Sequence, residues 1–406
     1  RQEAGFAVIL KGMDIGTHDR EFDIVLFGAT SFVGATTARY LVDCHPELKI
    51  AVAGRNADKL AALDLGVETI VADAQDAAAI DALVQRTAVL ISTVGPYTRY
   101  GDEVVRACAQ YGTHYVDLCG EALFIRRTID QWHATAQETG AKIVPSCGFD
   151  SVPSDMGMFH LFSSAGYPEF AEVTMAVDHL QGGLSGGTID SMRAVSKDAK
   201  EMPKGGAILH SPHSLSPDHK QEPDLGPEPD LVVDFDELLQ QWAGPFFMAM
   251  FNTRVVRRSN SLLGHAYGPM RYREVIPTGT GLAGKFKANL LKAVTAAGFA
   301  IIMVDKLRRP LSRFIPEPGE GPKDIDAGGF VISHTGLTTD GALHTSRVAA
   351  DGDPGYKTTA MMLAEAAVTL ATQPDDLPET TGVLTPATGL GRPYLRALQA
   401  HDMRFS

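Results

Sequence analysis

The stretch that decides the fold spans residues 22 to 34 and reads Phe-Asp-Ile-Val-Leu-Phe-Gly-Ala-Thr-Ser-Phe-Val-Gly. An apolar run typical of a buried strand leads into a glycine turn and a helix start, the geometry in which backbone N–H groups bind a dinucleotide pyrophosphate. The glycines permit the tight turn and close helix packing, while serine replaces the middle glycine of the pattern. A strand–turn–helix without a nucleotide remains the alternative. The cofactor-binding residues expected here are Gly28, Ala29, Thr30, Ser31, Phe32, Val33 and Gly34.

The end of the next apolar strand, residues 48–53, indicates which dinucleotide is bound. About 20 residues beyond the glycine turn, such folds distinguish a free ribose 2′-hydroxyl from a 2′-phosphate. Arg55 lies at this point, with Lys59 one turn further on. A guanidinium can bind a phosphate through two hydrogen bonds, so we predict NADP(H) rather than NAD; an arginine solvated in a loop is the alternative. Asp73, after the third strand, is a further candidate cofactor residue.

The composition excludes several classes of protein. The 406 residues, 44% of them hydrophobic, suffice for two or three packed domains. A net charge of −13 argues against nucleic acid and anionic membranes as partners. The four cysteines form no C-x-x-C pair, so we expect neither a disulfide framework nor a metal site, and we expect a cytoplasmic protein. Residues 1–20 lack the pattern of a signal peptide and are expected to form a loosely ordered extension.

From residue 21 to residue 150, strands and helices alternate at short intervals, which predicts an α/β fold with a doubly wound parallel sheet. The expected strands lie near 22–28, 48–53, 67–72, 88–94, 114–118 and 141–147, and the expected helices near 32–42, 57–64, 76–86, 101–111 and 122–139.

Residues 151–350 predict a second domain of α+β character, in which strand-like runs are separated by long Pro- and Gly-rich passages. The expected strands lie near 170–180, 254–259, 270–276, 329–338 and 342–349, and residues 202–230 are expected to form a surface loop. Residues 351–406 are expected to contribute two helices, 355–371 and 391–400.

Residues 288–304 form an apolar segment interrupted only by Lys292 and followed by a basic run. At about 17 residues, the segment is at the lower limit for a membrane span. We expect a buried helix. The alternatives are a cover over an acyl chain or a peripheral membrane contact through residues 288–309, which would place the protein at the inner face of the plasma membrane.

Candidate chemical groups follow the strand ends, where ligands of such sheets bind. Gly95, Pro96 and Tyr97 follow the fourth strand, and Gly95 and Pro96 are expected to bind the cofactor by letting the backbone approach the nicotinamide ribose. Asp150 and Ser151 follow the sixth strand. Asp117 and Glu121 could be acid–base groups or helix caps. Gly187 and Thr188, in a glycine-rich run, could contact an anionic substrate group, and Tyr356 could donate to an oxyanion.

The succession of motifs resembles the saccharopine-dehydrogenase-like oxidoreductases, and most closely their mycobacterial trans-acting enoyl reductases. The resemblance rests on G-A-T-S-F-V-G at 28–34, A-V-A-G-R at 51–55, S-T-V-G-P-Y at 92–97, C-G-F-D-S-V-P-S-D at 147–155 and D-G-D-P-G-Y-K at 351–357, and covers about residues 21 to 390. Two departures are Ser31, where glycine is usual, and residues 1–20, which have no counterpart.

This resemblance implies a Rossmann domain with an inserted substrate domain and C-terminal helices that return to it. It implies that NADP(H) reduces a carbon–carbon double bond in an acyl thioester held on a polyketide synthase carrier domain, in phthiocerol and phenolphthiocerol lipid synthesis. Gly28, Ser31, Gly34 and Arg55 match the family's cofactor positions. Tyr97, Tyr356 and Asp150 are the catalytic candidates, and Ser151, Gly187 and Thr188 the substrate candidates. A homo-oligomer is compatible with this assignment.

Two other functions remain open. An amino-acid oxidoreductase of the saccharopine dehydrogenase type would need several arginines in one cleft, and six are available: Arg193, Arg254, Arg257, Arg258, Arg271 and Arg273. The second alternative function is that of a lipid-associated protein that binds the nucleotide without catalysis. Ser31 and the segment 288–304 suggest it.

Overall fold

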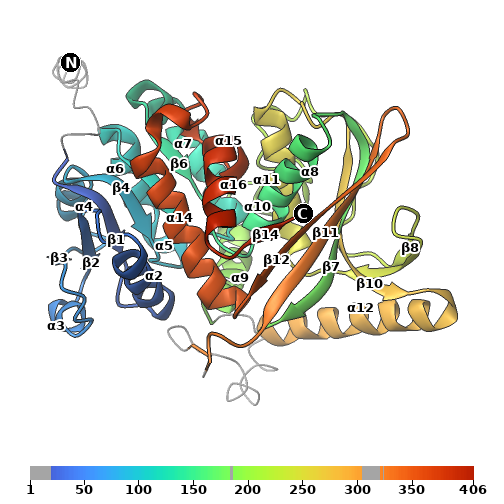
Figure 1. Cartoon of the computed structure of the whole chain (residues 1–406), viewed down its shortest axis with the longest axis horizontal. Coiled ribbons are helices and arrows are strands. Elements are labelled where there is room, and N and C mark those ends of the chain that lie inside the picture. Colours follow the sequence, from blue (N-terminus) through green and yellow to red (C-terminus); the bar gives the residue numbers. More distant parts are fainter. Residues whose placement is uncertain (1–19, 183–185, 304–320, 323) are drawn as a thin grey trace.

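The computed structural model describes the whole chain except residues 1–19, 183–185, 304–320 and 323 (Figure 1). The predicted N-terminal extension therefore lies, apart from residue 20, outside the described residues. Two seven-stranded sheets stand side by side, with helices packed between them (Figure 1).

The first sheet is parallel throughout and has the strand order β13-β6-β5-β4-β1-β2-β3, which confirms the predicted doubly wound fold. Its strands are β1 (Phe22–Phe27), β2 (Ile50–Gly54), β3 (Glu68–Val71), β4 (Thr87–Ser92), β5 (His114–Asp117), β6 (Lys142–Val144) and β13 (Gly382–Val383). The seventh strand, β13, was not predicted, because two residues are too few to show a strand pattern. The helices of this half are α2 (Phe32–Cys44), α3 (Ala57–Ala61), α4 (Ala77–Val84), α5 (Tyr97–Tyr100), α6 (Asp102–Tyr111) and α7 (Ala122–Thr139).

Both faces of the first sheet are covered, as its apolar strands require. Ile24 and Leu26 of β1 belong to the core that also contains α2 and α14 (Thr359–Thr372). Val25 and Phe27, which point to the other face, belong to the core formed with α4, α6 and α7. The helix α14 comes from the C-terminal part of the chain, yet it packs on α2, β4 and β5.

The second sheet is mixed, with the order β14-β12-β11-β7-β10-β9-β8, and only the β7–β10 pair is parallel. Its strands are β7 (Phe170–Gln181), β8 (Asp234–Asp236), β9 (Gln241–Pro245), β10 (Arg271–Gly279), β11 (Gly329–Thr338), β12 (Leu343–Asp351) and β14 (Arg404–Phe405). The other helical elements are α8 (Val152–Ser164), α9 (Gly186–Glu201), α10 (Gly205–His210), α11 (Ala249–Leu262), α12 (Gly281–Met303), the π-helical turn η4 (Pro354–Thr358), the 3-10 turn η5 (Pro374–Asp376), α15 (Pro386–Gly389) and α16 (Gly391–Ala400).

The strand predicted at 254–259 is wrong, because these residues lie in α11. The pair Val255 and Val256 favours a strand locally, but the flanking arginines are buried by partners far away in sequence. Arg254 pairs with Asp230 at 2.8 Å and Arg257 with Glu228 at 2.9 Å. These long-range ion pairs satisfy the charges on a helix that also packs on α8 and β10.

The prediction of a buried helix at 288–304 is also wrong. The helix α12 runs along the second sheet, on β9 and β10, and its buried residues are Gly284 and Ala288. In the loop predicted at 202–230, the structure adds one short helix, α10.

Candidate functional site

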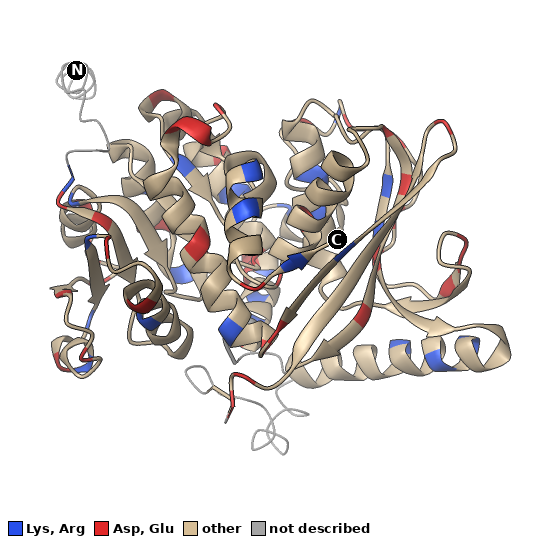
Figure 2. Cartoon of the chain, viewed as in Figure 1, with Lys and Arg blue, Asp and Glu red and all other residues tan. Residues whose placement is uncertain are grey.

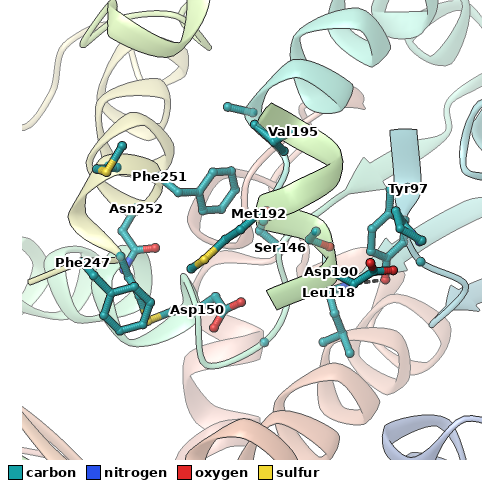
Figure 3. Close-up of a pocket in the computed structure, with 18 of the residues that line it drawn as sticks. Tyr97, Leu118, Ser146, Asp150, Asp190, Met192, Val195, Phe247, Phe251 and Asn252 are labelled. Carbon is teal, nitrogen blue, oxygen red and sulfur yellow. Dashed lines mark hydrogen bonds between the residues drawn. The ribbon is translucent and has the colours of Figure 1, made fainter. Parts of the chain in front are cut away.

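A cavity of about 680 Å³ lies between the carboxyl ends of the first sheet and the helices of the second domain (Figure 3). The strands β1 and β4 are neighbours in the sheet. The connections from β1 lead to β2 and β3 on one side, and those from β4 lead to β5 and β6 on the other, so the order of the strands reverses between β1 and β4. Such a switch point opens a crevice where ligands of doubly wound sheets bind.

The glycine turn at this crevice has no room for larger side chains. Gly28 has φ of 95°, and a Cβ atom there would lie 2.7 Å from Thr93 Oγ1. A Cβ atom at Gly34 would lie 2.4 Å from the carbonyl oxygen of Gly28. Both glycines are therefore required for the close approach of turn, helix and neighbouring strand.

Ser31 has a structural role at the helix start. Its hydroxyl accepts a hydrogen bond from Gly34 N at 3.0 Å and so caps α2. Ser31, Phe32 and Val33 line the cavity. The N-terminus of α2 thus faces open space, as the binding of a dinucleotide pyrophosphate requires, and these residues fit that group. Ala29 is buried beneath the turn and Thr30 is exposed beside it.

Three of the predicted cofactor residues are exposed and lie outside the cavity. Arg55 follows β2, Lys59 lies in α3, and Asp73 follows β3. In the described part of the chain, neither the guanidinium of Arg55 nor the ammonium of Lys59 has a hydrogen-bond or ion-pair partner. The side chain of Asp73 accepts from Gln75 N at 2.9 Å, so it shapes its own turn.

Gly95, Pro96 and Tyr97 line the cavity, but the hydroxyl of Tyr97 is engaged elsewhere. It donates to the carbonyl of Ser92 at 3.0 Å and accepts from Leu118 N at 3.2 Å. Burial raises the pKa of Tyr97 well above its ordinary value. This geometry does not support Tyr97 as a donor to an oxyanion; Tyr97 joins two strand ends and forms a wall of the cavity.

The two carboxylates after β5 are structural. Glu121 accepts from the backbone N–H groups of Tyr97 and Thr98, each at 2.9 Å, and from Ser191 Oγ at 2.8 Å. It therefore caps α5 and ties α9 to the first sheet. Asp117 accepts from Cys119 N at 2.8 Å and Ser146 N at 2.9 Å, and burial raises its pKa to about 6.

Asp150 is the acidic group that the cavity leaves unengaged. Its carboxyl lies at the cavity (Figure 3), where Oδ2 would be 3.7 Å from a Cβ atom at Gly120, and it makes no hydrogen bond or ion pair with another described residue. Burial alone raises its pKa to about 6. The neighbouring Phe149 positions the loop: its N–H donates to Thr359 Oγ1 at 3.0 Å, and its ring packs on Phe330.

Of the remaining catalytic and substrate candidates, one lines the cavity, one is buried behind it, and two lie at the start of α9. Tyr356 lines the cavity beside the start of α2, where its ring packs on Phe32 with centroids 5.0 Å apart. Ser151 is buried behind the cavity, with its hydroxyl 3.5 Å from Asn252 Oδ1, which does not support direct substrate contact. Gly187 and Thr188 lie in the first turn of α9, where the structure describes the backbone alone.

The opposite wall of the cavity is mainly apolar, although Lys200 and His210 also belong to the lining, and the sequence indicated only part of this wall. The run 246–251, which we interpreted as core or as an acyl channel, contributes Phe247, Met248, Met250 and Phe251. The helix α9 adds Met192, Val195, Ser196 and Ala199, and α12 adds Phe299 and Met303 at its C-terminal end. The positions on α9 follow the i, i+3, i+4, i+7 spacing of one helix face, the signal that could have identified them.

None of the six arginines considered for a substrate with several carboxylates lines this cavity. Arg254 and Arg257 form the ion pairs described above, and Arg273 pairs with Asp234 at 2.6 Å. Arg258 donates to backbone carbonyls of Leu215 and Val383, and Arg271 to that of Leu225. Arg193 lies 3.9 Å from Asp190 on its own helix.

Comparison with known proteins gives relatives over the whole chain. Residues 24–144 match the saccharopine dehydrogenase NADP-binding domain. A trans-acting enoyl reductase of Mycobacterium ulcerans is 38% identical over 405 residues, which cover 93% of this chain and 96% of the relative. A Mycobacterium tuberculosis protein named putative trans-acting enoyl reductase is 42% identical over 402 residues, which cover 94% of this chain and 96% of the relative.

The fold also has a solved counterpart. The saccharopine dehydrogenase of Saccharomyces cerevisiae superposes with a TM-score of 0.51 at 13% identity, covering 95% of this chain and 99% of that structure. At this identity the likeness concerns the fold alone. Identity to the mycobacterial proteins over nearly the full length carries the assignment: the chain belongs to the saccharopine-dehydrogenase-like oxidoreductases, a family with a nicotinamide-dinucleotide-binding domain, in the group of the trans-acting enoyl reductases.

Proposed function

We propose that this protein is an NADPH-dependent enoyl reductase that reduces an α,β-unsaturated acyl thioester presented by a polyketide synthase carrier domain. The observation that carries the proposal is one cavity that joins the N-terminus of α2 to an apolar chamber containing the unengaged carboxyl of Asp150. When bound, NADPH would supply a hydride to the β-carbon of the double bond.

The chain's own residues would bind the reactants and provide a proton. The turn at residues 28–34 fits the pyrophosphate, and Arg55 with Lys59 offers unpaired cations for a 2′-phosphate. The apolar side chains of α9 and of residues 247–251 exclude water and hold an acyl chain.

Asp150 is the candidate acid that protonates the α-carbon. With its pKa raised to about 6, about one carboxyl in ten is protonated at pH 7, whereas an ordinary aspartic acid would be almost fully ionised. Tyr356, at the same cavity beside Phe32, is the remaining candidate for hydrogen bonding to the thioester oxygen.

The chemistry of the chamber favours an acyl chain over an amino acid. A substrate with several carboxylates would need guanidinium groups in the cavity, and the arginines Arg193, Arg254, Arg257, Arg258, Arg271 and Arg273 are engaged elsewhere among the described residues. The resemblance to the mycobacterial enzymes supports polyketide-derived lipids of the phthiocerol and phenolphthiocerol type as the pathway, with the enzyme in the cytoplasm.

Two titrations and one turnover experiment test this proposal. Purified protein is titrated with NADPH and with NADH while the blue shift of nicotinamide fluorescence is recorded, and an enoyl thioester is then added. We expect tighter binding of NADPH and oxidation of the bound cofactor. Tight binding without turnover on any acyl length would favour a non-catalytic nucleotide-binding protein. Turnover on amino acids alone would favour the saccharopine dehydrogenase type of activity.

A further inference from the structure

The helix α12 has a face that the described part of the protein leaves uncovered. The opposite face lies close on the second sheet: a Cβ atom at Gly284 would lie 2.1 Å from Gly279 O, and one at Gly244 of β9 would lie 2.8 Å from Leu291. Small residues thus let the helix lie against β9 and β10 (Figure 1). The side of the helix opposite this contact faces outward.

Large apolar side chains follow one another along the outward face. Leu282, Phe286, Leu290 and Val294 are 86%, 70%, 53% and 60% exposed. Their spacing of four residues places them in one stripe along the helix, about 18 Å long at 1.5 Å per residue. A contiguous apolar stripe of this kind marks a contact surface, whereas single exposed apolar residues are ordinary.

The charges on α12 flank this stripe. At 100° per residue, Lys287 lies at one edge of the stripe. Lys285 and Lys292 lie on its other side, nearer the face that meets the sheet, and the ammonium of Lys285 stands 5.0 Å from the centre of the Trp242 ring. The helix contains no Asp or Glu, although the whole chain has a net charge of −13 (Figure 2). An apolar stripe with lysines on both sides suits an interface in which the stripe enters an apolar layer and the long lysine side chains reach anionic groups at its border.

We propose that α12 lies flat on an anionic phospholipid membrane, with residues 282–294 as the contact; the local positive charge of this helix sets it apart from the whole chain, whose net charge argues against such a partner. Self-association of this stripe would bring lysines against lysines, with no carboxylate on the helix to pair with them. The helix is long and apolar enough by composition to span a membrane. Its packing along β9 and β10 holds it on the protein instead, so the geometry supports a surface contact.

The contact would also orient the cavity. Phe299 and Met303, at the C-terminal end of the same helix, line the cavity that we assign to the acyl chain. Because the stripe 282–294 lies on the opposite face of α12 from these two residues, the helix itself would stand between the membrane and this end of the chamber. The membrane contact itself does not depend on the proposed reductase activity.

Flotation with vesicles tests the contact on the full chain. Protein is mixed with vesicles of phosphatidylcholine alone or with one third phosphatidylglycerol, at low and at high salt. We expect flotation with the anionic vesicles that weakens at high salt. The variant K285E/K287E/K292E should lose about 100-fold in affinity or more, from about 1 kcal/mol for each lysine. F286E/L290E should abolish flotation.

The matched control is L343E in the β11–β12 hairpin, which removes an apolar side chain that is 63% exposed and should float like the wild type. NADPH titration and thermal unfolding confirm that each variant is folded. Absence of flotation, or flotation unchanged in F286E/L290E, would overturn the proposal. So would a wild-type dimer that F286E/L290E converts to a monomer, or retention of the protein by an acidic carrier domain through these residues in place of vesicles.

Discussion

The two walls of the cavity are built in different ways. The wall from the first sheet consists of turns that follow parallel strands, and each turn is fixed by contacts close in sequence, such as the cap that Ser31 forms with Gly34 N. The opposite wall consists of side chains from α9, α11 and α12, placed by packing between distant segments. On the proposed function, the first wall would bind the cofactor and the second would hold the acyl chain.

The largest effect is expected from Gly34→Val in the first wall. The added side chain would overlap the carbonyl of Gly28, so NADPH affinity should fall at least about 100-fold, or roughly 3 kcal/mol. Fluorescence titration measures the loss, and unfolding measures stability. The control is Gly298→Val, a helical glycine with open space around its Cβ position, which should bind NADPH normally. Equal losses in both variants would show that the turn does not form the cofactor site.

Asp150→Asn should abolish most of the turnover while NADPH still binds. We expect kcat to fall about 100-fold, the usual contribution of a general acid. Because Asp150 would act in its protonated form, the wild-type rate should decline as the pH rises through about 6, and this decline should be absent in the variant. Asp190→Asn, which changes another carboxyl at the cavity, is the control. A variant with a normal rate would exclude Asp150 as the acid.

The raised pKa of Asp150 also predicts how the free energy of unfolding changes with pH. Burial raises the pKa of Asp150 in the folded state, so the folded protein holds its proton more tightly than the unfolded chain does. Stability contributed by this group is therefore present below about pH 4 and is lost as the pH rises toward 6. Denaturant unfolding of Asp150→Asn should show a gain relative to wild type at pH 7 and little difference at pH 4. The opposite sign would mean that the carboxyl is stabilised as an anion.

The second wall is tested by Met192→Trp, which fills the chamber from α9. We expect kcat/KM for long acyl thioesters to fall about tenfold relative to short ones, with no change in NADPH affinity. Met202→Trp, a substitution outside the residues that line the cavity, should leave the chain-length profile unchanged. If Met192→Trp weakened NADPH instead, the division of the two walls would be wrong.

An effect of similar size is expected from Arg55→Ala, because the residue is exposed. NADPH affinity should fall about tenfold and NADH affinity should stay constant, since only NADPH has the 2′-phosphate. Arg396→Ala, an exposed arginine on α16, provides the control for loss of one positive charge. An equal loss for both cofactors would show that Arg55 does not contact the phosphate.

The same difference between the walls explains what the sequence could predict. The alternation of strands and helices from Phe22 onward is a local pattern, so the parallel sheet and the glycine turn could be predicted. The position of Asp150 at a strand end followed from the rule that ligands bind there.

Features that depend on distant partners could not be predicted. The valines at 255–256 favour a strand. The flanking arginines, however, form ion pairs with Asp230 and Glu228, and these pairs stabilise the segment as part of α11. The apolar composition of α12 suggested burial, yet composition does not show which face meets the sheet. The hydroxyl of Tyr97 looked available in sequence, and only the fold brings Leu118 N to it.

The most direct test of the central claim, that a nicotinamide cofactor at the turn 28–34 reduces an acyl chain in the adjoining chamber, follows the transferred hydrogen. Protein is incubated with NADPH carrying deuterium at C4 and an enoyl thioester, and the product is examined by NMR. We predict deuterium at the β-carbon of the saturated chain and a solvent-derived hydrogen at the α-carbon. Bound NADPH with no deuterium in the acyl chain, at any chain length, would contradict the claim.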